Sequence, residues 1–287
     1  MPRGVSPLDE ARLQGRLWTP TQLRTALWLD AADLSTISVA TGASTWRDKS
    51  GNQRHFTQGT GGTQPTLTPN GLNGLNVLSF NGSQWLTSAN TAATWNFLHN
   101  TNGSSIFAVW KAGNSSDPNA AHGLMGTNAA TSANIGTYIA YDDRASAPRN
   151  NGLLVQVSGG GSTSVSAASA DGLMPANTPV ILSHIVDPNN GTPANRSFVR
   201  VNKTLSQINT LSTAPSASNA SFTLQIGAVG SNTVPLIGYI AEIIILASIA
   251  SARVRQQIDG YLAWRWALRE ALTAGHPFAN RPPLIGG

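Results

Sequence analysis

Between Leu27 and Ile249 the apolar residues lose any helical period and occur in short runs that alternate with polar residues or are β-branched. Asn, Gly, Ser, Thr and Pro fill the gaps between these runs. Many short strands joined by turn-forming residues are typical of two antiparallel sheets that bury alternate side chains. The sequence therefore predicts an all-β fold, an antiparallel β-sandwich or jelly roll. The predicted strands are residues 27–30, 75–80, 105–110, 153–157, 180–186, 198–201, 222–226 and 238–246.

The composition limits the class of protein further. The 287 residues are 40% apolar and 11% charged, which is too hydrophobic for a disordered chain and too polar for a membrane protein. No run approaches the ~18 apolar residues of a membrane span, and no secretory signal is visible at the start. The absence of Cys excludes disulfides, thiolate metal sites and cysteine nucleophiles. We therefore expect a soluble protein that does not insert into a membrane.

The net charge of +5 belongs to the two ends of the chain. Residues 1–25 hold four Arg against two acids, and residues 251–287 hold five Arg against two acids, whereas the middle has as many acids as bases. A protein that binds nucleic acid through its body needs a stripe of bases along the phosphates, and the scattered bases form none. We therefore expect no nucleic-acid partner. The basic ends either dock on acidic neighbours or are solvated terminal charge.

Residues 1–25 form a separate N-terminal arm in this interpretation. A capping Ser6, a Pro at the first helical position and acids in the first turn predict a short helix to about Arg16. An apolar segment this short is not stable alone, so it packs either on its own domain or on a partner. The residues predicted to attach it to a partner are Leu8, Leu13, Leu17 and Trp18.

In residues 251–287 the spacing of the apolar residues changes from that of strands to that of a helix. Ser251 is a plausible cap, and apolar residues at three- and four-residue steps predict an amphipathic helix over residues 252–270. Arg253, Arg255 and Gln256 are expected to face water. Gly and Pro then end the helix and keep the last residues extended, packed on the sandwich or on a neighbour.

Several short motifs occur in both halves of the chain. In the front half these are residues 28–34 (Trp-Leu-Asp-Ala-Ala-Asp-Leu), 46–52 (Trp-Arg-Asp-Lys-Ser-Gly-Asn), Pro65 with Asn73-Gly74, and 77–82 (Val-Leu-Ser-Phe-Asn-Gly). In the back half they are the last predicted strand at residues 238–245, the predicted helix at 257–266, and the tail with Gly275-His276-Pro277-Phe278 and Pro282-Pro283. Together these motifs resemble the concanavalin A-like, laminin-G-like domains of bacteriophage virion proteins.

The resemblance spans residues 26–283, with a weak match from about 112 to 220. It implies a concanavalin A-like jelly roll over residues 26–250, set in a tailed-phage particle. Relatives often carry Asp where Asn81 stands, and the family's calcium sites use acidic loop residues. Because the acids of this chain are dispersed, we predict no metal site and no cofactor.

The sequence lacks the residue patterns of common hydrolases. Glucanases of this fold need two carboxylates along one strand, and this chain has only Glu10, Glu242 and Glu270. Glu242 is expected on the face opposite Ala241 and Ile243, hydrogen-bonded at a sheet margin. The five His residues show no metal-ligand spacing, and no nucleophile elbow exists. The sequence therefore predicts that the protein is not an enzyme.

One cluster has the residue types of a sugar site, because aromatic rings stack on saccharides and planar polar groups take paired hydroxyls. An ordinary solvated hairpin turn explains the same spacing. The candidate glycan contacts are Tyr138, Tyr141, Asp142, Asp143 and Arg144.

The favoured function is a non-enzymatic structural protein of a phage particle, of tail-fibre or appendage type, anchored by its arm and displaying a lectin-like domain for host attachment. The alternative is a capsid decoration protein. From other classes, a glycan-processing enzyme and a free carbohydrate-binding module remain open. The expected partners are other virion proteins, further copies of the chain and a host-surface glycan, and the expected location is the exterior of a particle assembled in the host cytoplasm.

Overall fold

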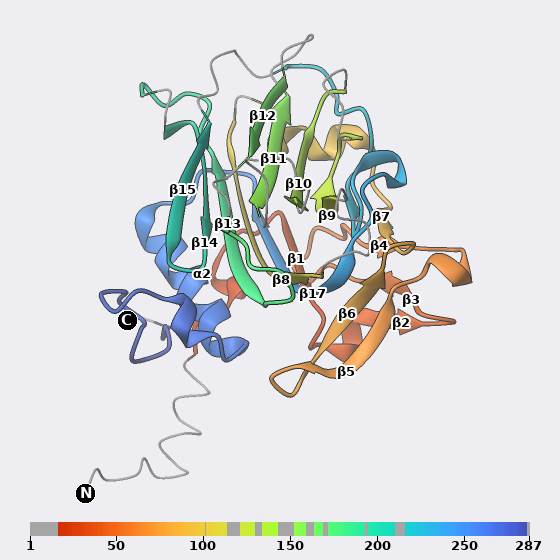
Figure 1. Cartoon of the computed structure of the whole chain (residues 1–287), viewed down its shortest axis with the longest axis horizontal. Helices are drawn as coiled ribbons and strands as arrows, with labels where there is room; N and C mark the ends of the chain where they lie inside the picture. Colours follow the sequence, from red (N-terminus) through yellow and green to blue (C-terminus); the bar gives the residue numbers. More distant parts are fainter. Residues whose placement is uncertain are drawn as a thin grey trace, which may run out of the picture.

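The computed structural model describes residues 17–100, 102–113, 121–129, 134–142, 152–158, 164–168, 172–192, 195–209 and 216–285. Within these residues two antiparallel sheets pack face to face, and one α-helix lies outside them (Figure 1). The predicted all-β sandwich with a C-terminal helix is confirmed. The predicted N-terminal helix, up to Arg16, lies outside the described residues.

The first sheet has eight strands, in the order β15-β14-β13-β8-β17-β6-β5 with β1 also paired to β17. Strand β17 is central, because β8 pairs along one edge while β6 and β1 share the other. The strands are β1 Leu27–Asp30, β5 Thr66–Leu72, β6 Leu75–Asn81, β8 Ser104–Ala112, β13 Val180–Val186, β14 Ser197–Val201, β15 Thr204–Asn209 and β17 Ile237–Leu246.

The second sheet has nine shorter strands, in the order β12-β11-β10-β9-β16-β7-β4-β3-β2. They are β2 Ile37–Val39, β3 Ala43–Trp46, β4 Phe56–Thr57, β7 Leu86–Ser88, β9 Ala121–Gly126, β10 Thr137–Asp142, β11 Gly152–Ser158, β12 Ser164–Ala168 and β16 Gln225–Ile226. Short segments of 3-10 helix lie between strands or near the two ends of the described chain: η1 Pro20–Gln22, η2 Leu34–Thr36, η3 Gly61–Thr63, η4 Ala92–Leu98, η6 Gly230–Asn232 and η7 Arg269–Ala271.

Large side chains fill the space between the two sheets. Trp46, Trp95 and Trp110 are fully buried there, together with aliphatic residues from both sheets. Burying a side chain of this kind contributes roughly 1.5–3 kcal/mol or more, so this layer carries much of the stability. In β14 the residues alternate between this core and the outer face of the sheet, as the two-residue period of a strand requires.

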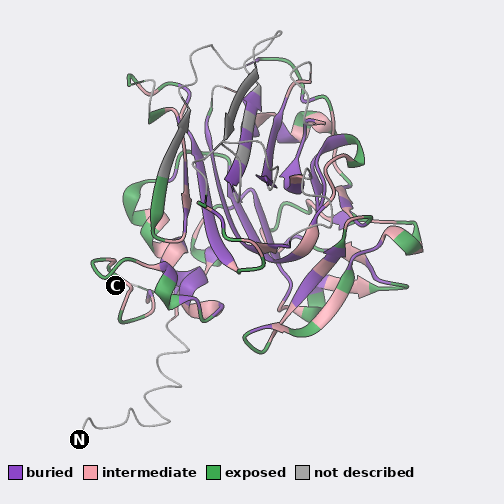
Figure 2. Ribbon diagram, viewed as in Figure 1, coloured by how far each residue is buried: buried purple, intermediate pink, exposed green. Residues whose placement is uncertain are grey.

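A third layer covers the outer face of the eight-stranded sheet. Helix α2, Ala252–Arg265, lies against this face, and the C-terminal segment lies beside the helix (Figure 1). Ile258, Leu262 and Trp266 pack there on residues of β8 and β17. Figure 2 shows buried residues both between the sheets and beneath the helix. The sheet is therefore buried on both faces over much of its area, which fits its nearly continuous apolar strands.

The helix begins where the sequence predicts and ends earlier. Ser251 caps it by accepting a hydrogen bond from the Val254 amide. The predicted end at residue 270 is wrong, because Trp266 already leaves the helical conformation and Ala267 has a φ of 52°. That left-handed conformation is the common way to end a helix, but Gly usually adopts it. With Ala in this position, the sequence carries no visible stop signal.

Candidate functional site

A groove runs between the outer face of the eight-stranded sheet and the inner edge of α2 with its following tail. Its sheet side is built by alternation, since Phe198 and Arg200 of β14 point outward while their neighbours enter the core. Its helix side presents Arg255 and Asp259, which are four residues apart and share one face of the helix.

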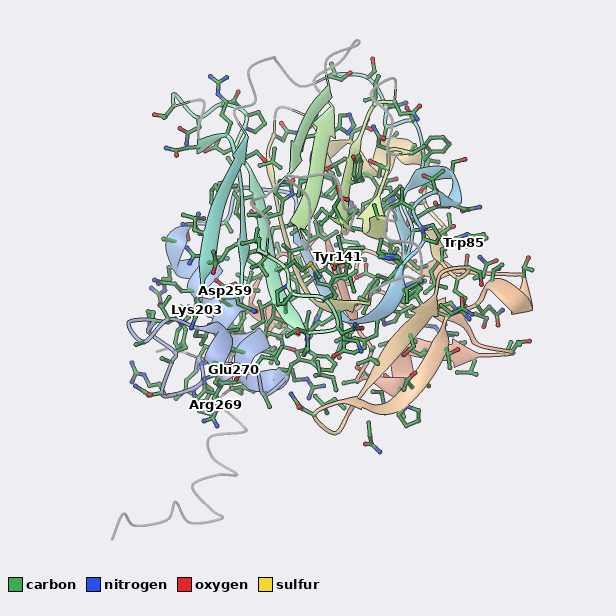
Figure 3. All side chains as sticks on the ribbon, viewed as in Figure 1. Trp85, Tyr141, Lys203, Asp259, Arg269 and Glu270 are labelled. Carbon is green, nitrogen blue, oxygen red and sulfur yellow. The ribbon has the colours of Figure 1, made fainter. Side chains whose placement is uncertain are left out.

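The groove consists of two adjoining hollows of about 210 Å³ and about 310 Å³, which share Phe198, Arg200 and Arg255. Together they fall within the roughly 300–1,000 Å³ typical of small-molecule sites. Figure 3 shows Asp259 and Lys203, which both line the first hollow, close together beside α2. Other residues of the first hollow are Ser183, Asn202, Gln256, Thr273 and His276, and those of the second include Asp187 and Asn190.

Asp259 lies on the wall of the first hollow. Its Oδ1 atom is buried and has no hydrogen-bond partner among the described residues. Burial raises the pKa of the Asp259 carboxyl to about 7, although the charges of Arg200 and Arg255 lower it. The carboxyl therefore changes its charge near neutral pH, which is uncommon for Asp.

A second group of polar residues lies beneath the same helix and is closed to solvent. We call it the Glu242 cluster; it comprises Glu242, Trp28, Tyr261 and Trp266. Trp28 Nε1 donates to Glu242 Oε1 at 2.7 Å, Trp266 Nε1 donates to Oε2 at 2.6 Å, and the Tyr261 hydroxyl donates to the same carboxylate. Glu242 is 0% exposed, so its carboxyl group joins β1, β17 and α2 from inside the fold.

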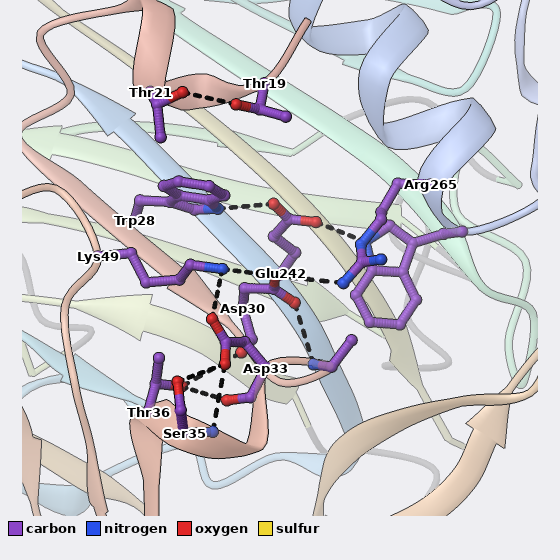
Figure 4. Close-up of polar contacts among 12 residues, drawn as sticks. Thr19, Thr21, Trp28, Asp30, Asp33, Ser35, Thr36, Lys49, Glu242 and Arg265 are labelled. Carbon is purple, nitrogen blue, oxygen red and sulfur yellow. Dashed lines mark hydrogen bonds and ion pairs between the residues drawn. The ribbon is translucent and has the colours of Figure 1, made fainter. Parts of the chain in front are cut away.

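Ion pairs extend this cluster toward the surface (Figure 4). Asp30 lies directly opposite Glu242 in the β1–β17 pairing. Its Oδ2 atom is 3.0 Å from Lys49 Nζ and 3.5 Å from Arg265 Nη2, and Lys49 also contacts Asp33 at 2.8 Å. Two cations thus face the Asp30 carboxylate beside Glu242. The contact between Lys49 and Asp30 also shows that the motifs at residues 28–34 and 46–52 are neighbours in the structure.

Burial, followed by the charge of Asp30, raises the pKa of Glu242 above its usual value, while the three hydrogen-bond donors oppose this shift. Two parts of the sequence-based expectation for Glu242 are wrong. The residue lies in a central strand, not at a sheet margin. It also shares a face with Ala241, because the pairing of β17 with β8 shifts register between Ile240 and Glu242. Such a bulge places two consecutive residues on one side.

The candidate glycan contacts do not form an exposed surface in the described part of the chain. Tyr138 and Tyr141 are 3% and 0% exposed and pack in different clusters, on opposite faces of β10. Tyr141 stacks on His122 with ring centroids 6.1 Å apart, and Asp142 is buried. Asp143 and Arg144 lie outside the described residues. A sugar could not stack on these two rings as they stand.

Of the predicted attachment residues, Leu8 and Leu13 lie outside the described residues. Leu17 pairs with Leu284 in an isolated β-bridge, so the two ends of the described chain meet. Trp18 is 4% exposed and packs edge-on against Tyr261 with ring centroids 6.0 Å apart. Trp18 thus belongs to the layer under α2, and its ring is covered by its own chain.

Sequence reasoning missed the groove. Arg255 was expected to face water, but its guanidinium lies 5.3 Å from the centre of the Phe198 ring. The signals present were the spacing of Arg255 and Asp259 on the helix and the alternation of Phe198 and Arg200 in the strand. Neither tells which helix face meets which strand, so only the fold brings these residues together.

Two further findings concern other kinds of site. Among the described residues, no group of three or more His, Asp or Glu side chains is arranged to hold a metal ion. Within the same residues, no helix has the length and apolar character needed to cross a membrane.

The sequence matches no known protein family, and no curated protein has a significant sequence match to it. Solved structures share its fold. The botulinum neurotoxin serotype G binding domain has 11% identity and a TM-score of 0.56, over 85% of this chain and 52% of that one. Trypanosoma rangeli sialidase has 12% identity and a TM-score of 0.50, over 78% of this chain and 30% of that one. The CBM40 of Ruminococcus gnavus IT-sialidase, bound to α2,3-sialyllactose, has 12% identity and a TM-score of 0.42, over 54% of this chain and 80% of that one.

The two structures with TM-scores of 0.50 and 0.56 share the β-sandwich fold of this chain. The chain spans about half of the neurotoxin domain and less than a third of the sialidase. Because identities of this size establish fold alone, function must be argued from the groove itself.

Proposed function

We propose that the protein is a non-enzymatic virion protein of a tailed bacteriophage, of tail-fibre or appendage type, whose β-sandwich faces outward and adheres to host-surface glycan. The phage setting is supported by the resemblance of residues 28–34, 46–52, 238–245 and 257–266 to such domains. Its partners would be other virion proteins, held by the N-terminal arm, and further copies of the chain. Many weak sites on one particle gain avidity without a tight single contact.

The observation that carries the adhesive role is the open groove beside α2, which holds cations and neutral polar groups around an aromatic ring. This is the composition of a binding site for a polar ligand. A glycoside hydrolase instead needs two carboxylates, one on each side of the scissile bond. In the described part of the chain, each hollow of the groove has one carboxylate, Asp259 in the first and Asp187 in the second. The Asp187 carboxylate already accepts a hydrogen bond from Asn190, and Glu242 lies buried where no sugar reaches. These positions favour binding over hydrolysis.

Immunogold electron microscopy of purified phage particles tests the location. Gold over the tail is the expected result, gold over the head would support the capsid decoration alternative, and unlabelled particles would contradict a virion role. A polysaccharide-turnover assay on host-envelope glycan tests the absence of catalysis, and product formation would overturn it.

Deleting residues 1–16 tests the arm. This variant keeps Leu17 and Trp18, which pack on the rest of the chain, whereas deletion of all of residues 1–25 would remove a buried ring. The shortened protein is expected to keep its melting temperature and its binding to host cells but to be missing from assembled particles. Incorporation at the level of the full chain would show that the arm does not attach it.

A further inference from the structure

Among the residues that the structure describes, no acid lies within ion-pair distance of the cations of the groove. Arg200 and Lys203 form no hydrogen bond or ion pair with the side chains that the structure describes, and Arg255 contacts the Phe198 ring without an ion pair. Surface arginines commonly pair with a nearby acid or remain in open solvent. Here they line a hollow whose first part contains a single carboxylate, Asp259.

The charges that face the groove therefore sum to a positive field. Arg200 and Lys203 come from β14 and the turn after it, Arg255 and Asp259 from α2, and His276 from the tail. The second hollow adds Asp187, whose Oδ2 accepts a hydrogen bond from Asn190 Nδ2 at 3.0 Å. Three cations against two acids, one of which resists ionisation, favour an anionic ligand.

The remaining wall suits a ligand with many hydroxyl groups. Hydroxyl and amide side chains line the first hollow together with the Phe198 ring, and Arg255, which contacts that ring, offers a planar guanidinium. Guanidinium groups bind a carboxylate with two parallel hydrogen bonds, and aromatic rings take the apolar face of a sugar. The neutral polar side chains are Ser183, Asn202, Gln256 and Thr273.

From these features we infer that the groove binds an acidic saccharide, with the ligand's carboxylate between Arg200 and Arg255 and its ring against Phe198 and the neutral polar wall. This inference rests on the proposed adhesive function and specifies its ligand. The proposed glycan site therefore lies between β14 and α2, whereas the sequence suggested a site at β10.

Calorimetric titration of the full chain with trigalacturonate and 3′-sialyllactose tests the inference, with galactotriose and lactose as neutral counterparts. At least one acidic probe is expected to bind at least tenfold more tightly than its neutral counterpart. Arg200→Gln and Arg255→Gln should each weaken this binding at least tenfold. Arg281→Gln, which changes an exposed arginine outside the groove, should leave it within twofold. Absence of binding by both acidic probes, or full binding by both groove variants, would overturn the inference.

A thymidylate hexamer separates saccharide recognition from simple attraction of anions. It is expected to bind at least tenfold more weakly than the better acidic sugar at 150 mM salt. Equal binding with the same dependence on Arg200 would show a general anion groove and would contradict the saccharide assignment.

The affinity should also depend on pH. As pH falls from 8 to 6, Asp259 takes up a proton and a negative charge beside the bound carboxylate disappears. Burial and the charge of Arg200 lower the pKa of His276, so its imidazole takes up a proton at a lower pH than an ordinary histidine. Binding of the acidic probe is expected to strengthen severalfold between pH 8 and 6 in the natural protein. In Asp259→Asn it should be strong and nearly independent of pH, and a pH dependence unchanged by this substitution would contradict the assigned position of the ligand.

Adhesion to host cells distinguishes failure of this inference from failure of the proposed function. If particles carry the protein and Arg200→Gln adheres like the natural chain, the groove is not the adhesive site although adhesion stands. If the groove binds the acidic probe but the chain does not adhere to host cells, the proposed function fails and the ligand assignment stands.

Discussion

Two carboxylates lie beside helix α2, and they differ in their hydrogen bonds and in their access to solvent. Glu242 reaches up from the central strand β17, is fully buried, and accepts hydrogen bonds from two indoles and a phenol. Asp259 belongs to the helix itself, borders an open groove, and has an oxygen without a partner in the described part of the chain. Burial raises the pKa of both carboxyls.

The difference separates a structural role from a binding role. A buried carboxylate whose oxygens are all used holds the fold together and is unavailable to a ligand. A carboxylate with unused hydrogen-bonding capacity beside unpaired arginines is a candidate for recognition. Both carboxyls have a raised pKa, so the pKa does not distinguish the two roles. The roles are distinguished by whether the oxygens of each carboxyl already accept hydrogen bonds and by whether solvent reaches the group.

The largest expected effect comes from Glu242→Gln. Both oxygens of the Glu242 carboxyl can accept a hydrogen bond, whether the group is ionised or protonated, but an amide nitrogen cannot. Either Trp28 or Trp266 would therefore lose its acceptor inside the fold, whichever way the amide turns. We expect a loss of about 3–5 kcal/mol in the free energy of unfolding, measured by urea denaturation. Glu270→Gln, an exposed acid in η7, is the matched control and should stay within about 0.5 kcal/mol. Equal stability of the two variants would show that the Glu242 cluster does not hold the layers together.

Trp18→Ala is expected to cost about 3 kcal/mol, because it leaves a cavity against Tyr261 under α2. Tyr261 is also a donor to Glu242, so the change loosens the closed side of the helix. The groove lies on the other side, and binding of the acidic probe should remain within twofold. Leu34→Ala, at a residue 55% exposed, serves as the control for stability. An unaltered melting temperature in Trp18→Ala would show that the ring is not part of the core.

The strands that the sequence predicts are those with strong apolar patterns. The predicted bounds of β1 and β13 match, and β6, β14 and β17 differ by one residue at an end, whereas β8 extends one residue before and two residues beyond its predicted bounds. Strands such as β5 (Thr-Leu-Thr-Pro-Asn-Gly-Leu) and β12 (Ser-Val-Ser-Ala-Ala) were missed, because their residues are those of turns and loops. Their partners in the sheets override these weak local preferences.

The site was less accessible to sequence reasoning than the fold. Ser251 as the helix cap and Glu242 as a hydrogen-bonded acid could be predicted from local patterns. The bulge that turns Glu242 toward α2, and the meeting of Arg200 with Asp259, depend on pairing between segments far apart in the chain. Local periodicity contains no information about such contacts. Conversely, Tyr138 and Tyr141 lie close together in the sequence and were predicted to share a glycan site, but the fold places them on opposite faces of β10.

A smaller effect is expected from pH. Because the folded-state pKa values of Glu242 and Asp259 are raised, the native state holds protons that the unfolded state has lost, and stability falls as pH rises through the folded values. The pKa of His184 is lowered to about 3, and those of His99 and His276 are also lowered, which opposes this trend in part at pH values around and below the ordinary histidine value of 6.5. The free energy of unfolding should therefore fall by about 1 kcal/mol between pH 6.5 and 8. Constant or rising stability over this range would mean that both carboxyls ionise at their usual values.

Asp259→Asn isolates the contribution of the groove, and its sign is opposite to that of Glu242→Gln. Asn removes a charge whose burial is unfavourable, so the variant should be about 1 kcal/mol more stable than the natural protein at pH 8. This advantage should shrink as pH falls from 7 toward 4, because Asp259 is then protonated in the folded state. Urea denaturation at three pH values measures it. Destabilisation by Asn at pH 8 would mean that Arg200 and Arg255 hold Asp259 as an ion pair, and the two carboxylates beside α2 would then share one structural role.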